Sequence, residues 1–378
     1  MIKNKLPFGL YIHVPFCRSK CSYCDFYSAT YNEDLAKLYV DAVISEFKSV
    51  LLEFDDIEFD TIYIGGGTPS VLSNKTLNKL IESILALGRF SDDLEFTLEV
   101  NPESAVNLKA YADAGVNRLS VGVQSLNNDI LKSIGRIHTS TLALQVLEQA
   151  STYYKNVSAD IMLGLPNQKL SDISTSISLI APIVTHISAY ILKLSDDSPL
   201  GLKVRDGITT IMSDDEMADQ YECARDELMK FGFSCYEISN FAKSVNMQSR
   251  HNMKYWLRHE YIGLGPAAHS YINNKRFFNP PDLVKYLEFQ TPRFPRTFYD
   301  AIPLTKQEEI FEAIMLGLRL TTGIDVGKLN TDFNIDFLTD YADVIKKVSA
   351  VTSYNNGHFA MLPGKMLLES AVAVEFLH

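Results

Sequence analysis

The feature that most constrains the fold is a regular alternation of short apolar, β-branched segments with longer stretches of helical periodicity. Six segments have the composition of buried strands: 9–14, 61–67, 94–100, 117–123, 158–164 and 186–192. Between them, apolar residues recur at three- and four-residue spacing, as at Leu77, Leu80 and Ile84. Ser73 before this stretch and Gly88 after it are typical of a helix N-cap and a helix end.

Strands that alternate with helices pair in parallel through right-handed crossovers. Six units fall short of the eight of a complete TIM barrel. The pattern therefore predicts an α/β fold with its core over 8–195, either a TIM-like partial barrel or an open doubly wound sheet.

The later part of the chain has a looser pattern. A long helix is expected near 213–231, followed by a strand over 233–239. Residues 279–303 contain five prolines and are predicted to be a linker between a first domain, 1–278, and a C-terminal domain, 304–378. A helix over 305–320 opens the second domain, where Thr305 and Glu308 fit a capping box.

The charge and the apolar content exclude several classes of protein. The formal net charge of −11 disfavours binding to nucleic acids or to anionic membrane surfaces, which requires clustered Lys and Arg. No window approaches the ~20 apolar residues of a membrane span. The N-terminal stretch lacks the long apolar run and small-residue cleavage site of a signal peptide. A cytoplasmic location is therefore expected.

The five cysteines are too few, and odd in number, for a disulfide scaffold. Three of them, Cys17, Cys21 and Cys24, lie within eight residues directly after the first predicted strand, as C-x3-C-x2-C. Buried cysteines are often no more than small apolar side chains. Three in so short and polar a segment favour metal ligation instead.

The residues alone leave two kinds of metal site open. Zinc needs four ligands, and no second cysteine pair exists; His13, four residues before Cys17 on a strand, would have to fold back. A 4Fe-4S cluster held by three cysteines would keep one iron open for chemistry. Cys223 and Cys235 are isolated and are expected to be structural, with a distant fourth ligand as the alternative.

Several motifs together resemble a known family. LYIHVPFCRSKCSYCDF, IGGGTPS, EVNPES, RLSVGVQS and ADIMLGLPNQ occur in the order and at the approximate spacing of the oxygen-independent coproporphyrinogen dehydrogenase family, in the radical S-adenosylmethionine (SAM) superfamily. The resemblance covers most of 8–270 and extends to that family's small helical C-terminal domain. It implies a partial (β/α)6 radical SAM barrel in which the three cysteines hold a 4Fe-4S cluster whose open iron chelates SAM.

The resemblance also implies which residues bind SAM: Tyr11, Tyr23, Gly66, Gly67, Thr68, Glu99, Gln124, Arg136 and Asp160. Arg suits a carboxylate, and acidic or amide groups suit an ammonium or ribose hydroxyls. The residues alone leave structural alternatives for some of them: a tight turn for GGGTP, an ion pair for Glu99 and Asp160, and packing for Tyr11 and Tyr23. The loop 262–270 matches the family near the adenine, with a plain turn as the alternative.

Two differences from the dehydrogenase pattern resemble the HemW branch of this family, whose members are regarded as heme-binding chaperones. Phe26 stands where the dehydrogenase has a further cysteine, and only about eight residues precede the first strand. RHNMKYW (250–256) resembles an H-N-x-x-Y-W motif of the branch, which implies that His251 binds heme iron with Tyr255 and Trp256 against the porphyrin. A lone histidine is, on residues alone, more often a satisfied core or surface residue.

The expected function is that of a cytoplasmic heme chaperone in porphyrin metabolism, with a cluster and exchangeable SAM. It would pass heme to an acceptor protein of the respiratory chain and touch a membrane only through that acceptor, as a monomer or a cluster-dependent dimer. The alternatives are an enzyme that decarboxylates coproporphyrinogen III oxidatively and a structural zinc protein. The sequence leaves open whether the chain is an enzyme.

Overall fold

The structure of the chain is a computed structural model that describes residues 6–54, 56–288 and 303–377. Six parallel strands follow one another in the sheet in sequence order. They are β1 (Phe8–Val14), β4 (Phe59–Gly66), β5 (Phe90–Val100), β6 (Arg118–Gln124), β7 (Asn156–Leu163) and β8 (His186–Ile191). The six predicted strands are thus confirmed, and their pairing confirms the α/β class.

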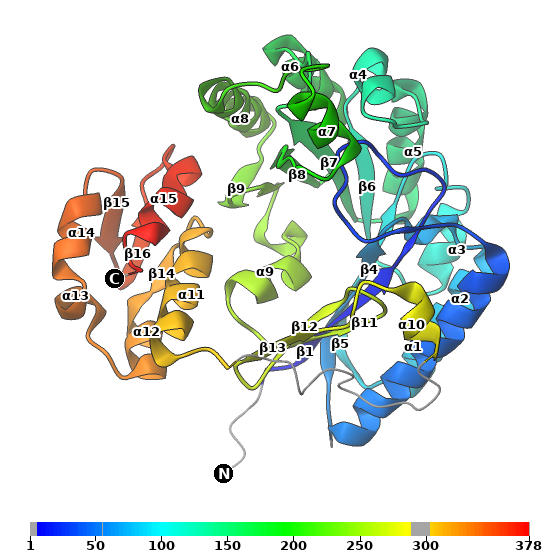
Figure 1. Ribbon diagram of the computed structural model, residues 1–378, viewed down its shortest axis with the longest axis horizontal. Helices are drawn as coiled ribbons and strands as arrows, with labels where there is room; N and C mark the ends of the chain where they lie inside the picture. Colours follow the sequence, from blue (N-terminus) through cyan, green and yellow to red (C-terminus); the bar gives the residue numbers. More distant parts are fainter. Residues whose placement is uncertain (1–5, 55, 289–302, 378) are drawn as a thin grey trace.

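Five more strands extend the sheet to eleven, in the order β13-β12-β11-β1-β4-β5-β6-β7-β8-β10-β9. Beside β1 lie β11 (Tyr261–Leu264), which is parallel to it, and the antiparallel β12 (His269–Ile272) and β13 (Lys275–Phe278). Beside β8 lie β10 (Asn240–Ala242) and β9 (Ser234–Glu237). In the part of the chain that the structure describes, the two outer strands do not pair with each other, so the curved sheet forms a partial barrel (Figure 1).

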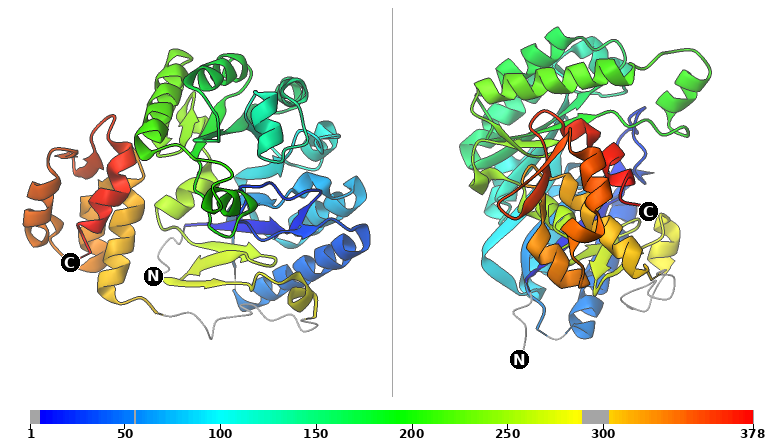
Figure 2. Two further views of the ribbon diagram at one scale, coloured as in Figure 1. Left: turned by 45° about the horizontal axis from the view of Figure 1, so that its top comes forward. Right: turned by 90° about the vertical axis from the view of Figure 1, so that its left-hand side faces the viewer.

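Helices cover the outer face of the sheet, as Figure 1 and Figure 2 show. They are α1 (Glu33–Glu53), α2 (Asn74–Leu87), α3 (Leu108–Asp113), α4 (Asn128–Ser133), α5 (Ser140–Tyr153), α6 (Leu170–Ile180), α8 (Asp214–Lys230) and α10 (Leu283–Glu288). Two further helices lie elsewhere. The Leu200 amide of α7 (Pro199–Arg205) donates to the Ser22 carbonyl of the cysteine loop, and α9 (Arg250–Trp256) packs against Thr61 on the inner face of β4. Shorter elements are β2 (Phe16–Cys17), β3 (Ala29–Thr30), η1 (Pro69–Val71) and η2 (Val245–Met247). The Ser73 side chain accepts a hydrogen bond from the Thr76 amide and Gly88 ends α2, as predicted.

The interior of the barrel is polar. Complete TIM barrels fill this space with branched apolar residues. Here the apolar residues of β6, such as Leu119 and Val121, pack under the helices, while Arg118 and Ser120 alternate with them on the other face. Ser120 donates to Asp160 of β7 at 2.9–3.0 Å. Because polar groups are costly to leave unpaired, such an interior indicates a place for polar ligands.

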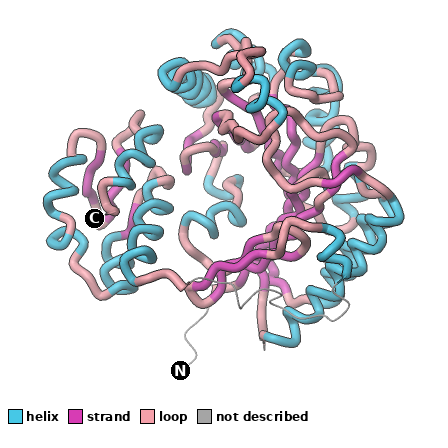
Figure 3. Tube along the Cα trace, viewed as in Figure 1, coloured by secondary structure: helices cyan, strands magenta, loops and turns pink. Residues whose placement is uncertain are grey.

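The C-terminal segment packs five helices around a small sheet, apart from the barrel in Figure 3. Its elements are α11 (Lys306–Leu318), α12 (Val326–Phe333), α13 (Phe337–Asp340), α14 (Ala342–Val348), η3 (Met366–Leu368), α15 (Glu369–Val374), β14 (Ile324–Asp325), β15 (Thr352–Asn355) and β16 (His358–Met361). The predicted capping box of α11 is present. The three-stranded sheet of β14, β16 and β15 was not predicted from the sequence. An ion pair between Arg258 Nε and Glu312 at 3.0 Å joins this segment to the barrel.

The segment predicted to be a linker, 279–303, contains the helix α10 in its described part. Tyr286 of α10 is buried, and its hydroxyl donates to Glu46 of α1 at 2.5 Å. This part therefore packs on the barrel instead of crossing solvent, and Pro280 and Pro281 precede it where a helix tolerates proline. Residues 289–302 lie outside the described residues, and the domain division at 278 and 304 stays a prediction. None of the described helices is long and apolar enough to span a bilayer.

Candidate functional site

A polar cavity of about 380 Å³ lies at the carboxyl ends of the parallel strands, beneath the cysteine loop. Ligand sites of α/β folds gather at this edge of the sheet. Eleven of the residues singled out in the sequence line it: Cys17, Cys21, Tyr23, Cys24, Gly66, Gly67, Thr68, Glu99, Gln124, Arg136 and Asp160. The fold thus collects into one place residues that are spread over more than 140 positions of the chain.

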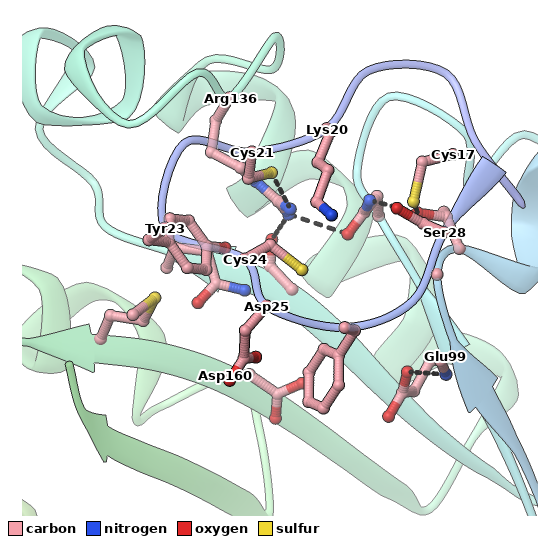
Figure 4. A pocket seen from close by; sticks show the side chains of 18 of the residues that line it. Cys17, Lys20, Cys21, Tyr23, Cys24, Asp25, Ser28, Glu99, Arg136 and Asp160 are labelled. Carbon is pink, nitrogen blue, oxygen red and sulfur yellow. Dashed lines mark hydrogen bonds between the residues drawn. The ribbon is translucent and has the colours of Figure 1, made fainter. Parts of the chain in front are cut away.

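The cysteine loop carries three thiols over this cavity (Figure 4). Cys21 Sγ accepts a hydrogen bond from Arg136 Nη1 at 3.6 Å, and Cys17 Sγ lies 3.7 Å from Thr68 Oγ1. Burial raises the pKa of Cys24 to about 11. Since metals bind the thiolate, loading this site would release protons. Among the described residues, no three Cys, His or acidic side chains are already gathered into a metal-binding group, so metal binding would have to draw the loop together.

The fourth ligands considered in the sequence analysis are not available. His13 has both ring nitrogens occupied, Nδ1 by the Tyr11 hydroxyl at 2.9 Å and Nε2 by the Tyr27 carbonyl at 3.1 Å. Cys223 lies on α8 and Cys235 on β9, and neither lines the polar cavity. Among the described residues, three thiols without any of these candidate fourth ligands fit a cluster with one open iron better than a closed structural zinc site.

The glycines at the end of β4, Gly66 and Gly67, are required by the packing of the chain itself. Gly66 has φ +105°, and a Cβ there would lie 2.6 Å from the His13 ring; a Cβ at Gly67 would lie 2.7 Å from the Phe16 carbonyl oxygen. The Gly66 amide donates to Glu99 Oε2 at 3.2 Å. The motif is therefore a tight turn, and it also forms part of the cavity wall.

Glu99 and Asp160 face the cavity from neighbouring parts of the sheet. Glu99 Oε1 accepts from the Tyr63 hydroxyl at 2.6 Å, and Asp160 accepts from Ser120. Burial raises the pKa of Glu99 to about 7 and also raises that of Asp160. In the described residues neither carboxylate is in an ion pair, which was the structural alternative. Both can therefore receive a cation or hydroxyls from a ligand.

Arg136 lines the cavity wall opposite Glu99 and Asp160 (Figure 4), and its partner Asn101 was not predicted from the sequence. Its Nη2 donates to Asn101 Oδ1 at 2.8 Å and to the Gly122 carbonyl. Asn101 in turn donates to Thr68 Oγ1 at 3.0 Å. Asn101 follows Glu99 by two positions, and the period of two along a strand is the signal that places both on one face. Gln124, also in this wall, has φ +64°, a costly conformation for a residue with a side chain and one that concentrates at functional sites.

Arg118 is a second residue that the sequence analysis missed. It is only 2% exposed, and its Nε has no hydrogen-bond partner in the described residues. It precedes Ser120 and Gly122 on the same face of β6, below the cavity, and its charge lowers the pKa values of Glu99 and Asp160 against the effect of burial. Arg118 thus offsets part of the cost of two buried carboxylates.

His251 and Tyr11 lie outside the polar cavity. His251 of α9 is buried, with Thr61 Oγ1 2.8 Å from Nδ1 and the Tyr255 hydroxyl 2.9 Å from Nε2. Burial lowers its pKa to about 3. The imidazole is neutral but has no free nitrogen for an iron in this arrangement. The Trp256 ring packs on the Arg319 guanidinium, 4.6 Å from it, and Tyr11 lines a second cavity.

The comparisons with known proteins agree with this geometry. A family model described as the radical SAM superfamily matches residues 11–180, and one described as the HemN C-terminal domain matches 304–350. The solved structure of coproporphyrinogen III oxidase (HemN) from Escherichia coli aligns with a TM-score of 0.84 at 20% identity, over 98% of this chain and 90% of that chain. Fold and cysteine loop thus define a protein of the radical SAM class, a class characterised by a 4Fe-4S cluster and SAM.

Curated relatives define the family more closely. The protein named heme chaperone HemW from Bacillus subtilis is 33% identical, over 94% of this chain and 96% of the relative. The protein of the same name from Lactococcus lactis is 35% identical, over 90% and 89%. The chain therefore belongs to the HemW family.

Proposed function

We propose that the chain binds heme and passes it to an acceptor protein, in keeping with the name heme chaperone that its relatives carry. The observation that carries this proposal is the similarity to HemW proteins along nearly the whole chain. The absence of a fourth thiol among the residues that line the polar cavity, where Phe26 follows the three cysteines, supports it.

The polar cavity would hold the cofactors of the class. Cys17, Cys21 and Cys24 would ligate the cluster, and Arg136 would face the carboxylate of SAM. Glu99, Asp160 and Gln124 would receive its ammonium or ribose hydroxyls, with Gly66, Gly67, Thr68 and Tyr23 completing the wall. When bound, the cluster supplies one-electron reducing chemistry. The chain's own part is to hold SAM in place and to keep water from it.

The partners and setting follow the same proposal. The acceptor would be a hemoprotein of the respiratory chain, and contact with a membrane would occur through that acceptor. The chain would work in the cytoplasm, as a monomer or as a dimer that depends on the cluster. The acceptor, the location and the oligomeric state belong to the same proposal, and the choice of acceptor is tested in the transfer assay.

The deciding experiment is a transfer assay. Cluster-loaded protein carrying heme is mixed, without oxygen, with a heme-free respiratory hemoprotein or with apomyoglobin as a passive heme trap. Transfer to the respiratory acceptor is expected to be faster than loss to the trap, because a chaperone hands over heme through a complex. Equal rates for both acceptors would contradict a chaperone role.

A second arm separates the chaperone from the enzyme considered in the sequence analysis. The loaded protein is incubated with SAM, a reductant and coproporphyrinogen III. No protoporphyrinogen is expected, whereas sustained turnover would replace the chaperone proposal by oxidative decarboxylation.

A further inference from the structure

A second cavity lies on the other side of the cysteine loop, and we call it the aromatic cavity. It has a volume of about 490 Å³, which is within the range of about 300–1,000 Å³ found for ligand pockets. Rings form most of its wall: Tyr11, Phe26, Tyr255, Tyr261, His269 and Phe278. A wall of this kind suits a large, flat, apolar ligand.

The rim of the aromatic cavity leaves two large rings in solvent. Phe26 is 62% exposed and Phe278 is 49% exposed. They come from distant parts of the chain, the cysteine loop and the strand β13, yet both border the same cavity. Exposed aromatic rings gathered at one opening indicate a surface that a ligand or partner covers.

His269 provides the one metal-binding nitrogen at this rim without a partner in the described chain. It is exposed on β12, and neither of its ring nitrogens makes a hydrogen bond to a described residue. The other two histidines near the cavity, His13 and His251, have both nitrogens occupied.

The orientation of His269 is fixed by its neighbour across the hairpin. The register pairs it with Phe278, and the two rings stack with centroids 5.1 Å apart and an angle of 24° between their planes. Partial burial, with the nearby charge of Arg276, lowers the pKa of His269. The imidazole is therefore neutral at physiological pH, which is the form that binds a metal.

We propose that one heme occupies the aromatic cavity, with His269 as the ligand of its iron and Phe26 against its ring system. The inference rests on the proposed function, since it names the place where the carried heme sits. Phe278 holds the imidazole in a fixed plane, and the exposed rim leaves the charged propionates in water, where they cost least. His251, in contrast, has its two ring nitrogens bonded to Thr61 and Tyr255 in the barrel interior.

The test is an anaerobic heme titration of the cluster-loaded full chain, followed by difference absorption spectra. For the wild type we expect the Soret band of a histidine-ligated heme. His269→Ala and His269→Gln should lose this band and weaken heme binding at least ~10-fold. Added imidazole should restore the band in His269→Gly, a rescue that a merely structural role would not give.

Controls distinguish loss of a ligand from loss of fold. His358→Ala, an exposed histidine of the C-terminal segment outside this cavity, should bind heme as the wild type does. The His269 variants should keep the cluster absorbance and the thermal stability of the wild type. If they bind heme with the wild-type spectrum, the aromatic cavity is not the heme site. If the wild type itself binds no heme, the proposed function fails and this inference with it.

Discussion

Two cavities flank the cysteine loop, and they differ in chemistry although they share part of their wall. Asp25 and Phe26 line both. On one side the wall presents carboxylates, Arg136, Gln124 and backbone groups; on the other it presents aromatic rings and a single unpaired imidazole. One short loop thus separates a site for a charged, hydrophilic ligand from a site for a flat apolar one.

Because the two walls differ in chemistry, binding to the two cavities should be separable by mutation. Affinity in the polar cavity depends on charged hydrogen bonds, which are directional and sensitive to protonation. Affinity in the aromatic cavity depends on buried ring area and one metal–nitrogen bond, which are insensitive to pH near neutrality. A substitution on one side of the cysteine loop should therefore leave ligand binding on the other side intact.

The largest effect is expected for Cys21→Ser. Removing one of three thiolates should abolish the brown cluster absorbance and reduce bound iron to background, because the remaining ligands no longer hold the cluster. SAM affinity should fall more than ~10-fold, since SAM loses the iron that chelates it. Heme affinity should stay within about twofold of the wild type, because the aromatic cavity contains no cysteine.

Iron analysis, a SAM binding isotherm and a heme titration on the same preparation check this prediction. Cys223→Ser is the matched control, as Cys223 lies on α8 away from both cavities. Joint loss of cluster and heme binding in Cys21→Ser would show that the cavities do not act separately. A colourless wild type with stoichiometric zinc would contradict the cluster itself.

The second prediction concerns pH and Glu99. Burial raises the pKa of Glu99 to about 7, with Asp160 raising it further and Tyr63, the Gly66 amide and Arg118 lowering it. A cationic ligand prefers the ionised carboxylate, so SAM affinity should rise with pH through about 7. Because one proton is linked to binding, SAM affinity should increase roughly tenfold between about pH 6 and pH 8.

Titration calorimetry across this window measures the slope. Glu99→Gln should flatten it, because the amide does not ionise. Heme affinity should change by less than about twofold, since the pKa of His269 is lowered from its usual value and the neutral imidazole persists. A heme affinity that follows the same slope as SAM would couple the two cavities and contradict their separation.

Much of the fold and of the polar cavity was predictable because the signals are local. The six strands, the Ser73 cap and the Thr305–Glu308 capping box each depend on residues a few positions apart. The cysteine spacing and the glycine motif are equally local, and both reach the polar cavity as expected. Asn101, which directly follows β5, and Arg118 of β6 were also within reach, since the period of two along a strand puts them on the ligand-facing side.

The aromatic cavity was not predictable, because non-local pairing creates it. The segment 262–270 was expected to be a loop near the adenine, with a plain turn as the alternative. None of its residues lines the polar cavity, and β11 at its start pairs with β1, about 250 positions earlier. His269 faces Phe278 only through the antiparallel register of β12 and β13. The surroundings of His251 are also non-local. Its motif predicted a heme ligand, but only the fold brings it against Thr61, 190 positions away, which occupies one ring nitrogen.

The smallest effect is expected for Phe26→Ala, at the residue that both cavities share. A ring that covers a bound porphyrin contributes about 0.5–1.5 kcal/mol beyond its area, so heme affinity should fall roughly 2- to 10-fold. SAM affinity should change by less than about twofold, because the hydrogen-bonding groups of the polar cavity remain. The same two titrations measure both values.

Phe231→Ala is the matched control, because Phe231 is an exposed ring at the end of α8 that lines neither cavity. It should alter neither affinity. If Phe26→Ala weakens SAM more than heme, Phe26 serves the polar cavity, and its 62% exposure would then mark the mouth of the SAM site. If heme is weakened more, the ring that follows the three cysteines separates the two ligands and contacts the apolar one.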